Sequence, residues 1–92
     1  MNRYRTEFFA KCPNNGLRIK YQLEIVTGEK VMVEDILAAV DALPSGFHED
    51  IADHLHARLG HQQVLTAHHH GVDIETIRPH VAHWVKGSEA LK

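Results

Sequence analysis

The sequence predicts an α+β fold in which one antiparallel sheet carries two helices on its apolar face. Two patterns lead to this expectation. Apolar and polar side chains alternate along residues 17–26, which is typical of a strand with one buried face. Apolar side chains then recur every three or four positions, first over residues 33–43 and again over residues 47–59, as in amphipathic helices. The expected order of elements is β-β-α-α-β-(β).

The first two strands are expected to form a hairpin. Tyr4 to Lys11 is rich in aromatic and other residues that favour strands. The apolar face of the second strand consists of Leu17, Ile19, Tyr21, Leu23 and Ile25. Asn14-Asn15-Gly16 lies between the two segments and tolerates positive φ, so it predicts an antiparallel turn.

Two helices are expected to follow the hairpin. The apolar face of the first consists of Val33, Ile36, Leu37, Val40 and Leu43, and Pro44-Ser45-Gly46 interrupts it. In the second, Phe47, Ile51, Leu55 and Leu59 repeat every four residues. The early carboxylates Glu49 and Asp50 suit the positive end of its dipole, and Gly60 can end it.

The remaining chain predicts a third strand from Gln63 to His70, and Val72 to Ile77 is either a short fourth strand or a helical turn before Pro79. Residues 1–79 are expected to form a single domain. Residues 80–92 are expected to be a partly ordered tail with a brief helix around Val81, Trp84 and Val85.

Composition narrows the class of protein. A net charge of -2 with neutral histidines gives no general attraction to nucleic acid. No run approaches the roughly 18 apolar residues of a membrane span. Cys12 is the single cysteine, so no internal disulfide forms, and the N-terminus lacks the apolar core of a secretory signal. We therefore expect a cytoplasmic protein without membrane or nucleic-acid partners. All nine histidines lie in the second half of the chain.

Four short motifs follow one another along the chain: Cys12-Pro13-Asn14-Asn15-Gly16, Val33-Glu34, Phe47-His48-Glu49-Asp50, and His70-Gly71-Val72-Asp73-Ile74. Over roughly residues 8 to 79 this order resembles the queuosine-pathway nitrile reductases, which convert 7-cyano-7-deazaguanine to its aminomethyl form. It also resembles their reductant-independent, amidine-forming relatives. The resemblance implies a T-fold (tunnelling-fold) unit. It further implies that these units assemble into rings, and that a purine-like base binds where subunits meet.

The resemblance also implies roles for individual residues. Cys12 falls at the position of the nucleophile, a thiolate that attacks the nitrile carbon and gives a covalent thioimide. Glu49 falls on the carboxylate that grips the base through two parallel hydrogen bonds. Glu34, Phe47 and His48 take the neighbouring positions of the base site.

This chain departs from the family pattern at three places. Ile19 stands where the family has the Asp that gives a proton to the nitrile nitrogen. Asp35-Ile36-Leu37-Ala38-Ala39 replaces the Ser-Lys-Ser-Leu-Lys associated with the nicotinamide phosphate, and His69-His70-Gly71 replaces Arg-Gly-Gly. Because the cationic anchors are missing, we predict no cofactor, NADPH included. The proton would then come from His48 or from a histidine of the third strand.

Two further alternatives stay open. Cys12 with His68 and His70 has ligand types that suit zinc, and alternate residues of a strand share a face; surface or tunnel lining is the other interpretation of these histidines. The protein could equally be a non-catalytic purine or pterin binder, or a structural ring. A small core and an edge strand at Arg3 to Lys11 predict a homo-oligomer in each case.

Overall fold

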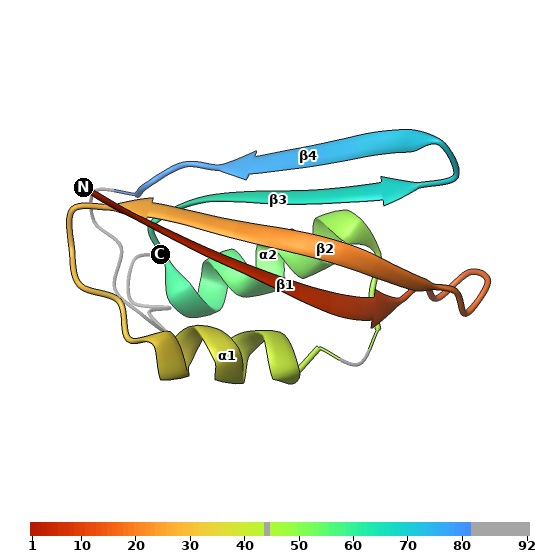
Figure 1. The fold of residues 1–92 in the computed structure, drawn as a ribbon, viewed down its shortest axis with the longest axis horizontal. Helices are drawn as coiled ribbons and strands as arrows, with labels where there is room; N and C mark the ends of the chain where they lie inside the picture. Colours follow the sequence, from red (N-terminus) through yellow and green to blue (C-terminus); the bar gives the residue numbers. More distant parts are fainter. Residues whose placement is uncertain (44, 82–92) are drawn as a thin grey trace, which may run out of the picture.

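The computed structural model describes residues 1–43 and 45–81. The elements are β1 (Asn2–Lys11), β2 (Arg18–Thr27), α1 (Val33–Asp41), α2 (His48–Leu59), β3 (Gln62–His69) and β4 (Val72–Arg78). The strands form one antiparallel sheet in the order β1-β2-β3-β4. Both helices cover the same face of that sheet (Figure 1). The α+β order is confirmed, and the segment from Val72 is a strand. The helix expected around Trp84 and Val85 lies outside the described residues.

The core lies between the sheet and the two helices. Side chains on the inner face of β1, β2 and β3 meet one stripe of each helix, and Leu23, Ile25, Leu55 and Leu65 are at most 1% exposed. Burial of one such side chain contributes roughly 1.5–3 kcal/mol to stability. The alternation that predicted a strand with one buried face is therefore confirmed in β2.

Some apolar residues that the sequence assigned to buried faces are exposed: Leu17, Val33, Leu37 and Phe47. Leu17 precedes β2 and belongs to the turn. The α1 helix buries only Ile36, Ala39 and Val40, because it contributes a single narrow stripe to the core. The prediction that Val33 and Leu37 belong to the buried face of this helix is therefore wrong. The helix also ends at Asp41, before the predicted Leu43.

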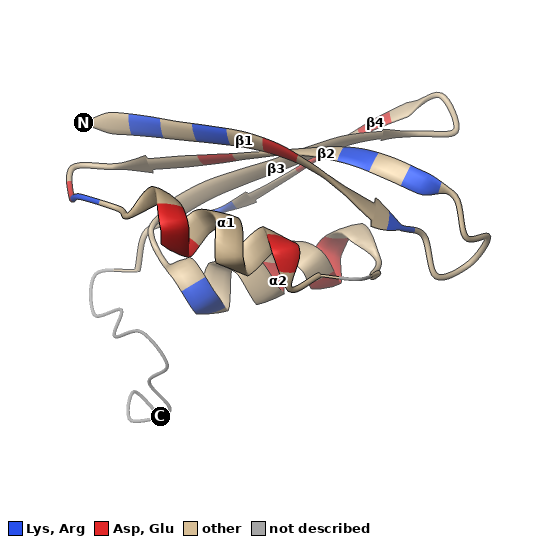
Figure 2. Ribbon diagram, turned by 60° about the horizontal axis from the view of Figure 1, so that its bottom comes forward, with Lys and Arg blue, Asp and Glu red and all other residues tan. Residues whose placement is uncertain are grey.

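The outer face of the sheet is charged. Glu24 lies 2.7 Å from Arg5 and 3.5 Å from Arg3, and Glu7 lies 3.2 Å from Lys20, all on neighbouring strands. Figure 2 shows basic residues along β1 and β2, and α2 also carries Arg58 in its last turn. These exposed pairs contribute little to stability, because water screens them. None of the helices in the described residues is long and apolar enough to cross a bilayer.

Candidate functional site

The turn between β1 and β2 fixes the position of Cys12. Its N–H donates to the carbonyl of Leu17 at 2.8 Å, and its own carbonyl accepts from the N–H of Gly16 at 2.8 Å. Gly16 has φ 74°, a conformation that glycine adopts without strain. Cys12 follows Phe8 and Ala10 on the inner face, so its side chain is buried at 5% exposure.

The segment after α1 brings the start of α2 beside this turn. Ser45 bridges to Lys11 at the end of β1, and the N–H of Gly46 donates to the Lys11 carbonyl at 3.3 Å. A Cβ at Gly46 would lie 3.0 Å from Cγ1 of Ile51, closer than side chains normally pack. The small residue therefore lets the chain pass tightly between β1 and α2 and directs Phe47 and His48 toward Cys12.

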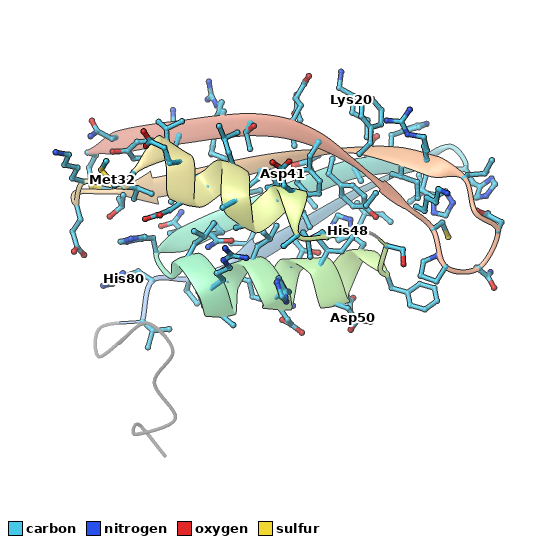
Figure 3. All side chains as sticks on the ribbon, turned by 90° about the horizontal axis from the view of Figure 1, so that it is seen from below. Lys20, Met32, Asp41, His48, Asp50 and His80 are labelled. Carbon is cyan, nitrogen blue, oxygen red and sulfur yellow. The ribbon has the colours of Figure 1, made fainter. Side chains whose placement is uncertain are left out.

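A cavity of about 210 Å³ opens at this junction. Its lining includes Cys12, Tyr21, Phe47, His48 and His69. Two of them, Phe47 and His48, start α2, and Figure 3 places His48 between that helix and the sheet. The predicted site residues Cys12, Phe47 and His48 are therefore brought together by the fold. Phe47 is 55% exposed although it lines the cavity, so its ring lies at the rim.

Hydrogen bonding sets the protonation state of His48. Its Nε2 lies 3.1 Å from the carbonyl of Leu65, and a carbonyl can only accept, so Nε2 carries the proton. Burial lowers the pKa of His48, although the Leu65 carbonyl and the carboxylate of Glu49 oppose the shift. The ring is therefore neutral near pH 7, and its Nδ1 is a lone-pair acceptor. That Nδ1 is buried without a hydrogen-bond partner among the described residues.

Two further titratable side chains line the cavity. Tyr21 is 2% exposed and lies between the rings of Phe8 and His48, with centroids 5.3 and 5.5 Å away. Burial and the neighbouring Cys12 raise the pKa of Tyr21, so it stays a neutral phenol. His69 ends β3, and its Nε2 is also buried without a partner in the described part of the chain.

The two carboxylates implied by the resemblance lie in different places. Glu49 is the second residue of α2, adjacent to His48 and exposed, so it can border the cavity mouth without lining the cavity. Glu34 is exposed in the first turn of α1. Figure 1 shows that this end of α1 lies opposite to the β1–β2 turn along the sheet. One subunit therefore does not bring Glu34 to Cys12.

The zinc set of Cys12, His68 and His70 does not come together. Cys12 is on the inner face, whereas His68 is exposed on the outer face, with its Nδ1 2.7 Å from the carboxylate of Asp73. His70 lies beyond the end of β3 with φ 52°, near Asn15 at 3.3 Å, so it does not continue the face of His68. Within residues 1–43 and 45–81, no group of three or more His, Cys, Asp or Glu side chains could hold a metal ion.

His69 is the site residue that the sequence analysis did not single out. The signal was present in β3, where Leu65 and Ala67 mark the inner face, so the next inward position is 69. The zinc alternative considered His68 and His70, which alternate with His69 along the strand. It therefore directed attention to the face opposite to that of His69.

No protein-family model matches this chain, and no curated protein sequence matches it. Among solved structures, the fold is similar to the crystal structure of the archaeosine synthase QueF-Like in the apo form. The two chains are 19% identical with a TM-score of 0.64, over 84% of this chain and 89% of the other. At that identity the likeness concerns the fold. The α+β architecture that the resemblance implies is therefore confirmed, because this chain shares its fold with that structure.

Proposed function

We propose that this protein binds a purine-like base of the 7-deazaguanine type and that Cys12 adds to a nitrile carried by that base. The cavity that gathers Cys12, Phe47 and His48 carries the proposal. It places a thiol, an aromatic ring and a hydrogen-bond acceptor around one space. The fold likeness to an archaeosine synthase supports the same class of ligand.

The cavity is large enough for only part of such a ligand. About 210 Å³ is less than the roughly 300–1,000 Å³ of pockets that enclose a whole small molecule. The cavity therefore takes the reacting substituent, and the planar base lies at the mouth against the exposed ring of Phe47. Glu49 beside the mouth accepts hydrogen bonds from the N–H groups of the base edge. Nδ1 of His48 accepts one more from a ligand donor inside.

In this proposal the reaction stops at the thioimide, or the carbon of the thioimide is transferred to another nucleophile. No hydride donor takes part. The α1 segment contains Glu34, Asp35 and Asp41 but no Lys or Arg. Such a helix repels the phosphates of a nicotinamide dinucleotide. This charge pattern supports reductant-independent thiol chemistry over nitrile reduction.

A ring of subunits would complete the site. Glu34 lies at the far end of its own subunit, so it can take part in base binding only from another copy. Within the described residues, β1 and β4 each have a neighbouring strand on one side only, and the free edge of β1 is covered at Lys11 by the bridge to Ser45. On the outer face β1 presents Arg3, Arg5 and Lys11 with Glu7, and β4 presents Asp73 and Glu75. Their opposite net charge supports pairing of β1 with β4 of the next copy. Light scattering at micromolar concentration tests this, and a monomer contradicts it.

A non-catalytic binder is the second candidate. It is favoured by the burial of Cys12, which fills the turn as a small apolar side chain would. In that case the base binds at the same mouth and the thiol has only a packing role.

The decisive experiment combines mass spectrometry with binding titration, using 7-cyano-7-deazaguanine and its analogue without the nitrile. We expect a covalent adduct on the parent protein, none on Cys12→Ala, and nearly equal affinity of both proteins for the analogue. Glu49→Ala should weaken binding of the analogue at least tenfold, because a charged hydrogen bond contributes about 1.5–3 kcal/mol and about 1.4 kcal/mol is one decade. Asp50→Ala, exposed in the same helical turn, is the matched control and should bind like the parent.

The outcomes separate the two candidates. A parent that binds both bases and never forms the adduct is a binder, and Cys12 is then a packing residue. If Glu49→Ala binds as tightly as Asp50→Ala, the proposed arrangement of the base at the mouth is wrong.

A further inference from the structure

Two imidazole nitrogens lack partners within the described part of the chain, and both belong to side chains that line the same cavity as Cys12. They are Nδ1 of His48 and Nε2 of His69, and both are buried. Buried polar atoms in folded proteins nearly always have a hydrogen-bond partner. Two such nitrogens at one cavity are available to a ligand that enters it, and they differ in what they can do for that ligand.

His48 is suited to holding a ligand. The Leu65 carbonyl fixes its ring through Nε2 at 3.1 Å, and the Tyr21 ring lies against it. Burial lowers its pKa, which favours the neutral form. Its Nδ1 is therefore a fixed acceptor for an N–H or O–H group, and a poor store for a proton.

His69 is suited to carrying a proton. Its ring lies against that of His70, with centroids 4.3 Å apart, and His70 is exposed. The Asn15 side chain, from the turn that holds Cys12, lies 3.3 Å from Nε2 of His70. His69 thus stands between the buried cavity and a solvent-exposed imidazole, and its Nε2 is the atom left without a partner in the described residues.

The other lining groups leave His69 as the acid–base candidate. Ile19, Ala67 and Ile74 are apolar, and no carboxylate of the described residues lines the cavity. Tyr21 stays a neutral phenol because burial and Cys12 raise its pKa. Among the side chains that line the cavity, His69 is the imidazole that is not bonded to a backbone carbonyl, and imidazole is the commonest general acid–base group.

We propose that His69 is a proton-transfer residue of this cavity, moving the Cys12 thiol proton to the nitrile nitrogen through Nε2. This inference rests on the proposed function. The Cys12 sulfur forms a bond to the nitrile carbon, and one π pair of the C≡N bond moves to nitrogen. The proton that leaves the sulfur reaches that nitrogen by way of His69, giving a thioimide. Atoms and electrons balance without an oxidant or a reductant.

The test measures the rate of adduct formation with saturating 7-cyano-7-deazaguanine by time-resolved mass spectrometry. His69→Gln should slow the adduct at least 10²-fold, the usual size of a general acid–base contribution. It should bind the analogue without the nitrile within about threefold of the parent. Added imidazole should restore part of the rate to His69→Ala, a response that loss of packing alone would not give. The matched control is His68→Gln, whose side chain is on the outer face and bonded to Asp73; its rate should equal that of the parent.

The possible failures are distinguishable. If His69→Gln forms the adduct at the parent rate, His69 has no part in proton transfer, while the proposed function stands. The same holds if His68→Gln and His69→Gln slow the reaction equally. If the parent binds the base but forms no adduct, the thiol chemistry of the proposed function fails and this inference fails with it.

Discussion

The two ends of the buried face of β3 differ in whether their polar side chains have hydrogen-bond partners. At one end Gln63 is 2% exposed, and its Nε2 donates to the carbonyls of Leu55 at 3.2 Å and Gly60 at 2.6 Å. At the other end the Nε2 of His69 is buried without a partner in the described residues. A buried polar group with its partners serves the fold, whereas one without them costs stability. The difference separates a structural end of the strand from a binding end.

The direction of α2 explains the difference. The C-terminal end of α2 lies over Gln63, and Gly60, which follows the helix, has a carbonyl without a helical donor. The Gln63 side chain donates to that carbonyl and also to the Leu55 carbonyl within the helix. At its other end α2 starts with His48. The ring of His48 is hydrogen-bonded to the Leu65 carbonyl, and the cavity lies between it and His69. The same helix therefore closes one end of the strand and leaves a cavity at the other.

The largest effect is expected at the closed end. Gln63→Met should lower the free energy of unfolding by about 1–3 kcal/mol, because it removes two buried hydrogen bonds and leaves the Gly60 carbonyl without its side-chain donor. Urea denaturation measures the change. Gln62→Met is the matched control, since Gln62 is the exposed neighbour on the outer face and should change stability little. Equal losses for the two variants would show that the helix end is not held by Gln63.

At the open end a substitution should act in the opposite direction. His69→Leu should raise the free energy of unfolding by about 1 kcal/mol, because it replaces an unpartnered buried nitrogen with apolar surface. The thermal midpoint should rise with it, whereas His68→Leu on the outer face should leave the midpoint nearly unchanged. A fall in the midpoint of His69→Leu would mean that the nitrogen has a partner in solution and that this end is structural as well.

The smallest effect is expected from the pH dependence of His48. Because burial lowers its folded-state pKa, the unfolded chain binds more protons below an ordinary histidine pKa of about 6.5. The stability contributed by the neutral ring is present above that pH and is lost as the pH falls through the lowered pKa. Denaturation at pH 7.5 and 5.5 should show a smaller loss for His48→Gln than for the parent. An identical loss would place the titration elsewhere in the chain.

The order of elements and the buried face of the sheet could be predicted from the sequence. Alternation in β2 and the three- and four-residue spacing in the helices follow from backbone geometry, so they can be seen before folding. It also identified Cys12, Phe47 and His48, because the turn and the helix start carry recognisable motifs. It did not determine the exposure of Leu37 or Val33, which depends on how much of α1 the sheet reaches.

The pairing of the sheet settles which of the three histidines lines the cavity, although the alternation through Leu65 and Ala67 already favoured position 69. Three adjacent histidines look alike in the sequence, and a shift of the pairing register by one residue would turn a different one toward the cavity. The pairing of β2 with β3, and the turn residue His70 at φ 52°, fix position 69 inward and position 68 outward. The separation of Glu34 from Cys12 was likewise invisible in the motif order, because two residues near helix starts can lie at opposite ends of a sheet when the helices run in opposite directions.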